Sequence, residues 1–245
     1  MAVARATEGI VMEDLLNQLL AVLQSLTTSG GDVAATTGKA IGGMDTAGLI
    51  ALSAALGWAS GLRLYLVVFI TGMAGYMGFI PLPVGLHLLQ HPAMLACSGF
   101  MLFVEFFADK IPGIDSLWDI VHSVIRIPAG AALAAGVFGA DSATMGAVAA
   151  MLGGTLAATS YATKATTRAA INTSPEPFSN MAASFAEEGM VMGAMWLATN
   201  YPMVFGVALV IVVVLMVGLL ISMFTFLKAI VQRVSGFFYG TRQRI

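Results

Sequence analysis

The stretch EFFADKIPGIDSLWDIVHSVIR, residues 105–126, contains many of the ionisable residues of this chain. One apolar run, residues 92–104, precedes it, and another, residues 127–140, follows it. Ionisable groups beside membrane-crossing segments are rare, and they usually mark paired or functional sites. The sequence therefore indicates a hydrophobic protein with a polar centre. The ionisable residues of the stretch are Glu105, Asp109, Lys110, Asp115, Asp119, His122 and Arg126.

The composition is that of an integral membrane protein. Of the 245 residues, 58% are hydrophobic and only 10% are charged, whereas a soluble domain carries about 25% charged residues. The formal net charge of −2 argues against a nucleic-acid partner. The single cysteine, Cys97, excludes an internal disulfide and a metal site made of several cysteines.

Successive apolar segments predict an all-α, polytopic bundle of six or seven transmembrane helices. They cover residues 46–62, 64–82, 92–104, 127–140, 143–161, 181–199 and 203–227. The segment 127–140 is short for a full span, so we predict a tilted, re-entrant or broken helix there. If 46–62 is a half-helix, six spans remain rather than seven.

Three regions follow from these segments. Residues 1–44 are predicted to form a tail with an amphipathic helix and a Gly-rich flexible linker. Residues 45–227 form the transmembrane domain, and residues 228–245 form a basic tail. A weak internal repeat aligns residues 45–65 with 141–161, pairing Gly57 with Gly153 and Tyr65 with Tyr161. Transporters often carry such repeats.

The basic residues near the C-terminus predict its orientation. After Glu188 the only charged residues are Lys228, Arg233, Arg242 and Arg244. Basic residues that flank spans are enriched on the cytoplasmic side, so the C-terminus is expected to be cytoplasmic. The side of the N-terminal tail depends on whether there are six or seven spans, and it stays open.

Acids and bases from several segments are predicted to form one coupled polar network, which would be a substrate or ion pathway. Glu187 and Glu188 lie about two turns into an apolar helix, where an acid is expensive unless it is paired, hydrated or protonated. Lys164 and Arg168, at i and i+4, are either membrane anchors or a cationic site for phosphate or carboxylate. The network comprises Glu105, Asp109, Arg126, Lys164, Arg168, Glu187 and Glu188.

A second pattern allows two interpretations. Asp115, Asp119 and His122 share one helix face at i, i+4 and i+7. Asp115 is suited to cap a helix after the Pro112-Gly113 turn, and Asp119 favours the positive end of that helix. The same three side chains are also suited to bind a divalent cation.

Two long motifs resemble a known family. The first combines Gly61-Leu62-Arg63, the stretch 105–126 and Pro128-Ala129-Gly130. The second is NTSPEPFSN, residues 172–180, followed by Ser184 and Glu187. With them, over about residues 47–230, the chain resembles domain-of-unknown-function family 4126, small polytopic membrane proteins of bacteria. Where the family is expected to have Glu-Asp, this chain has Glu187-Glu188. The resemblance implies a membrane fold with a polar core, located in the bacterial inner membrane, and implies no established reaction.

Three functions remain open. The chain is a transporter or channel, a protein that binds or translocates lipid phosphates, or a scaffold that transports nothing. An enzyme is less expected, because no nucleophile motif accompanies the Ser, Asp and His residues, and no cofactor is expected. The expected partners are membrane lipids and a small ion or anionic substrate, and a homo-oligomer stays open. A dry, fully paired polar cluster would favour the scaffold, whereas an opening sideways into lipid would favour lipid handling.

Overall fold

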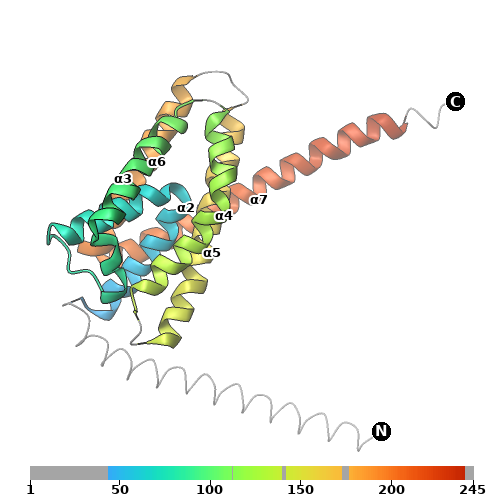
Figure 1. Ribbon diagram of the computed structural model, residues 1–245. Helices are drawn as coiled ribbons and strands as arrows, with labels where there is room; N and C mark the ends of the chain where they lie inside the picture. The colour runs from blue at the N-terminus through green and yellow to red at the C-terminus, as the bar shows by residue number, and fades with distance from the viewer. Residues whose placement is uncertain (1–43, 112, 140–141, 173–176, 241–245) are drawn as a thin grey trace, which may run out of the picture. The chain divides into compact units, whose positions relative to one another are not determined.

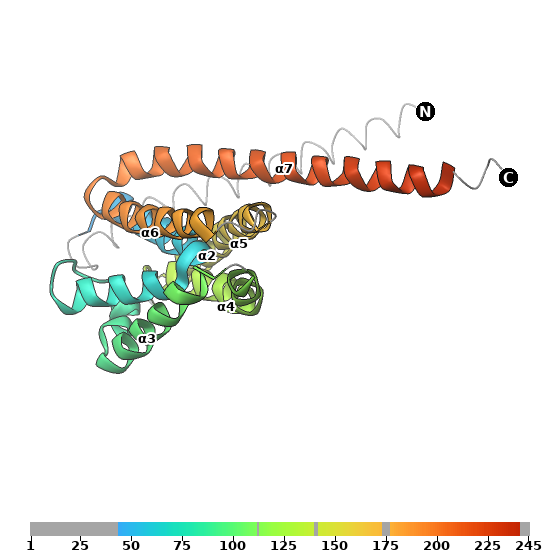
Figure 2. The ribbon, with the colours of Figure 1, turned by 90° about the horizontal axis from the view of Figure 1, so that it is seen from above.

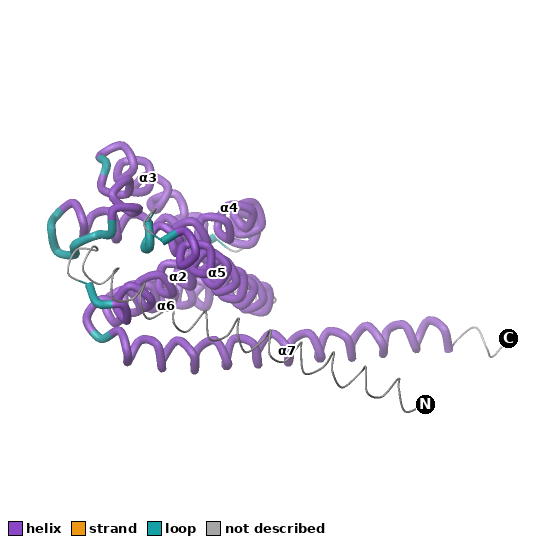
Figure 3. Tube along the Cα trace, turned by 90° about the horizontal axis from the view of Figure 1, so that it is seen from below, coloured by secondary structure: helices purple, strands orange, loops and turns teal. Residues whose placement is uncertain are grey.

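The structure is a computed structural model that describes residues 44–111, 113–139, 142–172 and 177–240 (Figure 1). This part of the chain contains no strand, so the predicted all-α class is confirmed. Figure 3 shows that short loops join the helices. Residues 1–43, which include the predicted amphipathic helix and linker, lie outside the described residues. The elements in chain order are α2 (Thr46–Tyr76), the 3₁₀ helix η1 (Val84–Gln90), α3 (Pro92–Ala108), α4 (Ile114–Gly136), α5 (Ala143–Ile171), α6 (Pro177–Asn200) and α7 (Pro202–Gly240).

Helix α2 is the most deeply buried element of the unit that begins at Ala47. Its sequence is apolar on all sides, as expected for a helix that is surrounded by others. The side chains of Leu49, Leu52, Leu56 and Val67 are fully buried. The apolar sequence of α2 therefore predicts both its helical conformation and its burial among the other helices.

Arg63 interrupts α2 with non-helical backbone angles, φ −147° and ψ 83°. The predicted segments 46–62 and 64–82 thus meet at this break, which divides α2 into two helical parts. A break inside a membrane helix frees backbone groups, which then need other partners. The Lys164 ammonium supplies one, because its Nζ donates to the Leu62 carbonyl at 3.1 Å.

The described residues contain four helices that are long and apolar enough to cross a membrane. The number of candidate spans rises to five if η1 and α3 count as one span, although the two helices are bent by 67° relative to each other. The predicted six or seven spans are not confirmed, because α2 unites two of them and α6 carries Glu187 and Glu188. Residues 127–136 continue α4 and form no re-entrant element of their own. The four helices are Thr46–Tyr76, Leu117–Gly136, Ala143–Ile171 and Pro202–Phe226.

Helix α7 lies against α5 and α6, and Figure 2 shows it running alongside α6. The helix continues to Gly240, although its membrane-crossing part ends at Phe226. The boundary predicted at residue 228 between membrane domain and basic tail therefore falls inside a continuous helix.

Small residues bring α2, α4 and α5 into close contact. A Cβ added to Gly57 would lie 2.5 Å from the Cα of Gly153. Next to this crossing, Ser160 Oγ donates to the Trp58 carbonyl at 2.6 Å, and Ser53 Oγ donates to the Ala134 carbonyl at 3.1 Å. Such residues let helix backbones approach within a membrane. Gly57 and Gly153 are also aligned in the proposed repeat, although the repeat itself is not confirmed.

We expect Gly57→Ala to lower the melting temperature, because the added Cβ would collide with the Gly153 backbone. Overpacking of this kind typically costs about 1–3 kcal/mol. The matched control is Gly189→Ala, where an added Cβ meets nothing within 4 Å. Thermal unfolding of both purified variants in detergent is the measurement. Equal melting temperatures would show that the α2–α5 crossing is looser than described.

Candidate functional site

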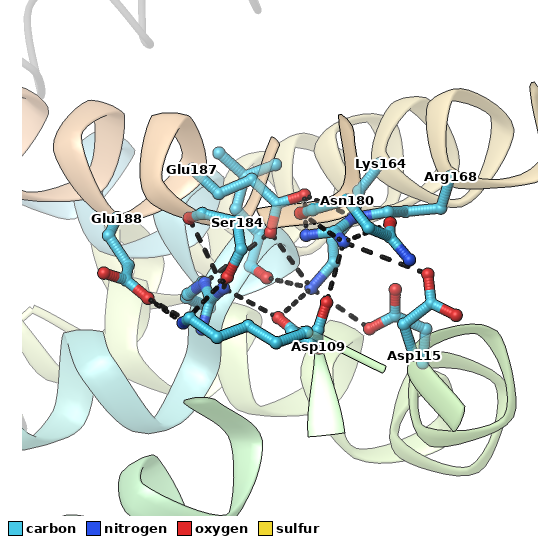
Figure 4. A network of polar contacts seen from close by, with 12 residues as sticks. Asp109, Asp115, Lys164, Arg168, Asn180, Ser184, Glu187 and Glu188 are labelled. Carbon is cyan, nitrogen blue, oxygen red and sulfur yellow. Dashed lines mark hydrogen bonds and ion pairs between the residues drawn. The ribbon is translucent and has the colours of Figure 1, made fainter. Parts of the chain in front are cut away.

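All charged side chains that the structure describes between residues 47 and 227 belong to one connected cluster. Figure 4 shows part of it, including Asp109, Lys164 and Glu187. They come from α2, the α3–α4 turn, and helices α3, α4, α5 and α6. Ion pairs link every member to at least one other. The basic members are Arg63, Lys110, Arg126, Lys164 and Arg168; the acidic members are Glu105, Asp109, Asp115, Asp119, Glu187 and Glu188.

Asp109 lies at the centre of the cluster, directly after the last residue of α3. Its Oδ2 pairs with Arg63 Nη2 at 2.8 Å and with Lys164 Nζ at 3.2 Å, and all three side chains are fully buried. Burial raises the pKa of Asp109, but Lys164 and Arg63 outweigh that effect and hold the pKa below its usual range. Asp109 is therefore the ionised hub that fixes the two cations.

Lys164 connects the hub to other helices. In addition to Asp109 and the Leu62 carbonyl, its Nζ pairs with Asp119 Oδ1 at 3.1 Å and with Glu187 Oε2 at 3.3 Å. An ammonium donates three hydrogen bonds, so Lys164 has more acceptors within reach than it can satisfy at once. It is therefore able to exchange one acidic partner for another.

Arg168 ties α6 to the cluster. Its guanidinium donates to Glu187 Oε1 at 3.1 Å, to Asn180 Oδ1 at 2.8 Å and to the Asp109 carbonyl at 3.0 Å. Arg168 is 1% exposed and Lys164 is 3% exposed. Side chains this deeply buried are parts of the network rather than anchors at the membrane surface.

Arg126 is shared by two carboxylates. Its Nη2 donates to Glu105 Oε1 at 2.6 Å, and its Nη1 donates to Asp119 Oδ1 at 2.6 Å. Glu105 is fully buried and has no other ion pair in the described part of the chain. Glu105 thus depends on a single cation, which it shares with Asp119.

The outer end of the cluster is more loosely paired. Glu188 Oε1 lies 3.5 Å from Arg63 Nη1 and 3.7 Å from Lys110 Nζ. The Lys110 ammonium sits 3.0 Å from the centroid of the Phe106 ring, a cation–π contact. Burial lowers the pKa of Lys110. Lys110 and Glu188 are partly exposed, so this end is where the cluster meets its surroundings.

The three residues of the metal hypothesis have other partners in the structure. Asp115 lies in the first turn of α4 and accepts from the backbone N–H of Gly113, the N-cap residue, at 2.8 Å and from the Asn172 amide at 3.1 Å. Asp119 pairs with Arg126 and Lys164. The His122 ring stacks on Trp118 with its centroids 3.9 Å apart. The described residues contain no group of three or more His, Cys, Asp or Glu arranged to hold a metal ion.

The cluster is incompletely satisfied. Five basic side chains face six acidic ones, which leaves a formal excess of one negative charge. Several buried polar atoms have no hydrogen-bond partner in the described part of the chain, although a buried polar group normally has one. They include Glu105 Oε2, Asp109 Oδ1, Asp119 Oδ2, Arg126 Nε, Arg63 Nε and Arg63 Nη1.

The structure brings together all seven residues predicted to form the network, and it adds others to them. Arg63 and Lys110 were not among the predicted network residues, and Asp119 was interpreted either as favouring the positive end of a helix or as a ligand of a divalent cation. Asn180 and Ser184 were missed. Their signal was spacing, because residues 180, 184 and 187 share one face of α6 at i, i+4 and i+7. In the structure Ser184 Oγ accepts from Arg63 Nη2 at 2.6 Å.

Comparison with known proteins gives one match. The model of the family described as "Domain of unknown function (DUF4126)" matches residues 50–222, which contain the whole cluster. Neither a curated protein nor a solved structure matches the chain.

We expect Arg126→Gln to destabilise the fold, because it leaves Glu105 and Asp119 buried without this cation. Removing one partner of a buried ion pair typically costs about 3–5 kcal/mol. Adding Glu105→Gln to this variant should recover part of the loss. Unfolding in mixed micelles is the measurement, and Lys228→Gln, which removes one exposed charge, is the control. Strictly additive effects of the two substitutions would contradict the pairing.

Proposed function

The chain belongs to domain-of-unknown-function family 4126, and we propose that it is a membrane transporter that couples the movement of its substrate to protons. The observation that carries this proposal is the buried cluster at the break of α2, with its one uncompensated negative charge. A charge inside a membrane protein is expensive unless it is paired, hydrated or neutralised. One bound proton would remove the excess charge.

Glu105 is the carboxylate that we assign as the proton carrier. It is fully buried, its Oε2 has no hydrogen-bond partner in the described part of the chain, and it shares Arg126 with Asp119. Asp109, in contrast, has two cations of its own within 3.2 Å. We therefore assign the proton to Glu105, because its one cation, Arg126, is shared with Asp119 and its Oε2 has no hydrogen-bond partner in the described residues.

Lys164 connects the protonation of Glu105 to the backbone at the break of α2. It bonds both the carbonyl freed by the break in α2 and the carboxylates of the cluster. When Glu105 takes a proton, Arg126 turns fully to Asp119, and Lys164 loses part of its attraction to Asp119. The bond from Lys164 to Leu62 then changes, and so does the angle at which the two halves of α2 meet. Discontinuous helices of this kind form the substrate sites of many transporters.

The same proposal places the protein in the bacterial inner membrane with its C-terminus in the cytoplasm. Its substrate is a small ion or an anionic molecule, and membrane lipids are its partners. The orientation is supported by Lys228, Arg233, Arg242 and Arg244, the only charged residues after Glu188.

A scaffold that transports nothing is the second candidate. The low exposure of the cluster favours it, because most of its members are less than 10% exposed. A scaffold would use the cluster only to lock helices together. It therefore predicts that every acid contributes to stability, whereas the transporter predicts that one acid does not.

We expect Glu105→Gln to keep the melting temperature close to that of the unchanged protein and to abolish proton movement, because Gln imitates the protonated acid but cannot release a proton. The assay is the internal pH of proteoliposomes after addition of a panel of ions and lipid phosphates. Asp109→Asn serves as the contrast, because it deprives Arg63 and Lys164 of their shared partner and should unfold the protein. A Glu105→Gln protein that moves protons normally, or one that fails to fold, would overturn the assignment.

We further expect a reporter attached after Ile245 to be cytoplasmic. Green fluorescent protein fused there should fluoresce, and alkaline phosphatase fused there should be inactive, because each folds productively on one side of the membrane only. The opposite pair of results would overturn the orientation.

A further inference from the structure

A groove opens on the side of the bundle beside the charged cluster. It has a volume of about 360 Å³ and lies between α2, α3 and α6. Its walls are apolar, and Phe103 and Met192 on its rim are 62% and 52% exposed. In a membrane such a side opening faces hydrocarbon rather than water. Residues that line it include Leu66, Leu102, Phe103, Phe106, Met192 and, as its charged member, Glu188.

Cationic groups stand at the Glu188 end of the groove. The Lys110 ammonium lies on the ring of Phe106, which lines the groove, and 4.6 Å from the centroid of Phe185. Behind Glu188, the fully buried Arg63 has two guanidinium nitrogens, Nε and Nη1, without a hydrogen-bond partner in the described residues. The charged end of the apolar groove is thus Glu188, a loosely paired carboxylate that contacts both Arg63 and Lys110.

We propose that this groove binds one acyl chain of an anionic phospholipid, whose phosphate takes the place of Glu188 at Lys110 and Arg63. This inference rests on the proposed function, because it names the substrate class of the same cluster. The lipid enters sideways from the membrane, with its chain between α3 and α6 and its head group at the cluster.

The geometry around Glu188 supports its displacement. Its contacts at 3.5 and 3.7 Å exceed the distance of a charge-assisted hydrogen bond, about 2.7–2.9 Å. A phosphate offers more acceptor oxygens than a carboxylate, and its geometry matches the fork of donors on a guanidinium. Arg63 would thereby gain hydrogen bonds at Nε and Nη1, which now have only ion-pair contacts of 3.6 Å to Glu187 and 3.5 Å to Glu188.

The size and lining of the groove support a single chain as its occupant. Ligand sites usually enclose about 300–1,000 Å³ and combine apolar walls with a few polar groups. The groove lies at the lower end of that range, so it admits one chain and leaves the rest of the lipid in the bilayer. Phosphate alone would leave the apolar walls without an occupant.

The test is photolabelling in proteoliposomes with phosphatidylglycerol that carries a diazirine on one acyl chain, compared with phosphatidylcholine labelled in the same way. We expect the anionic lipid to label the peptides around Phe103 and Met192 several-fold more strongly. Met192→Trp should fill the groove and reduce this labelling several-fold. The matched control is Met190→Trp, the same substitution at an exposed position of α6 that does not line the groove.

Two further variants test the head-group site in opposite directions. Lys110→Gln should abolish the preference for the anionic lipid, and Lys110→Arg should restore it. Glu188→Gln should strengthen labelling, because it removes the carboxylate that competes with the phosphate. A merely structural role for these side chains would not move the lipid preference in opposite directions. The melting temperature of each variant shows that it is folded.

Each outcome decides the inference. Equal labelling by the two lipids, or full labelling of Met192→Trp, would mean that lipid only surrounds the protein and would overturn the proposal. Proton movement that persists in either case would leave the proposed function standing. Specific labelling without any proton movement in the unchanged protein would instead support the lipid site and overturn proton coupling.

Discussion

The pairing of Arg63 with Asp109 is the interaction on which the remaining structure depends. Arg63 sits at the break of α2, so its guanidinium enters the centre of the helix bundle. A buried cation needs a partner, and Asp109 provides one at 2.8 Å from the turn after α3. Lys164 from α5 joins the same carboxylate. One carboxylate thereby fixes the relative positions of α2, α3 and α5, and the surrounding ion pairs add α4 and α6.

Because two ion pairs meet at Asp109, a change in the charge of one residue alters the ion pairs of others. Lys164 and Arg126 each contact more than one carboxylate, so a proton that neutralises one acid releases a cation to the next. Low dielectric strengthens each of these exchanges. Since Lys164 also bonds the freed Leu62 carbonyl, a redistribution of charge reaches the backbone without any intermediate element.

The sequence predicted which segments are helical and which residues form the network. It predicted less well how the helices are arranged and which residues pair. Apolar runs indicate helices, and acids such as Glu105 and Glu187 stand out because an acid within such a run needs a partner. The predicted apolar segments end at residue 62 and resume at residue 64, so the sequence does indicate an interruption at Arg63. It does not indicate the partner of Arg63, the Asp109 carboxylate that follows another helix. The predicted six or seven spans are not confirmed. A divalent cation was one interpretation of Asp119, because spacing alone does not reveal the cations on other helices.

The proposed lipid site and the proposed proton site belong to one connected cluster of ion pairs, and this connection has a thermodynamic consequence. A lipid phosphate carries one negative charge of its own, so the cluster with bound lipid has one more negative charge than the cluster alone, which already has an excess of one. Additional negative charge favours proton uptake by the remaining carboxylates. Coupling between two binding events is reciprocal, so a proton bound in the cluster favours the anionic lipid by the same factor. Coupled movement of proton and lipid thus requires no contact between them, only the charge balance of one buried network.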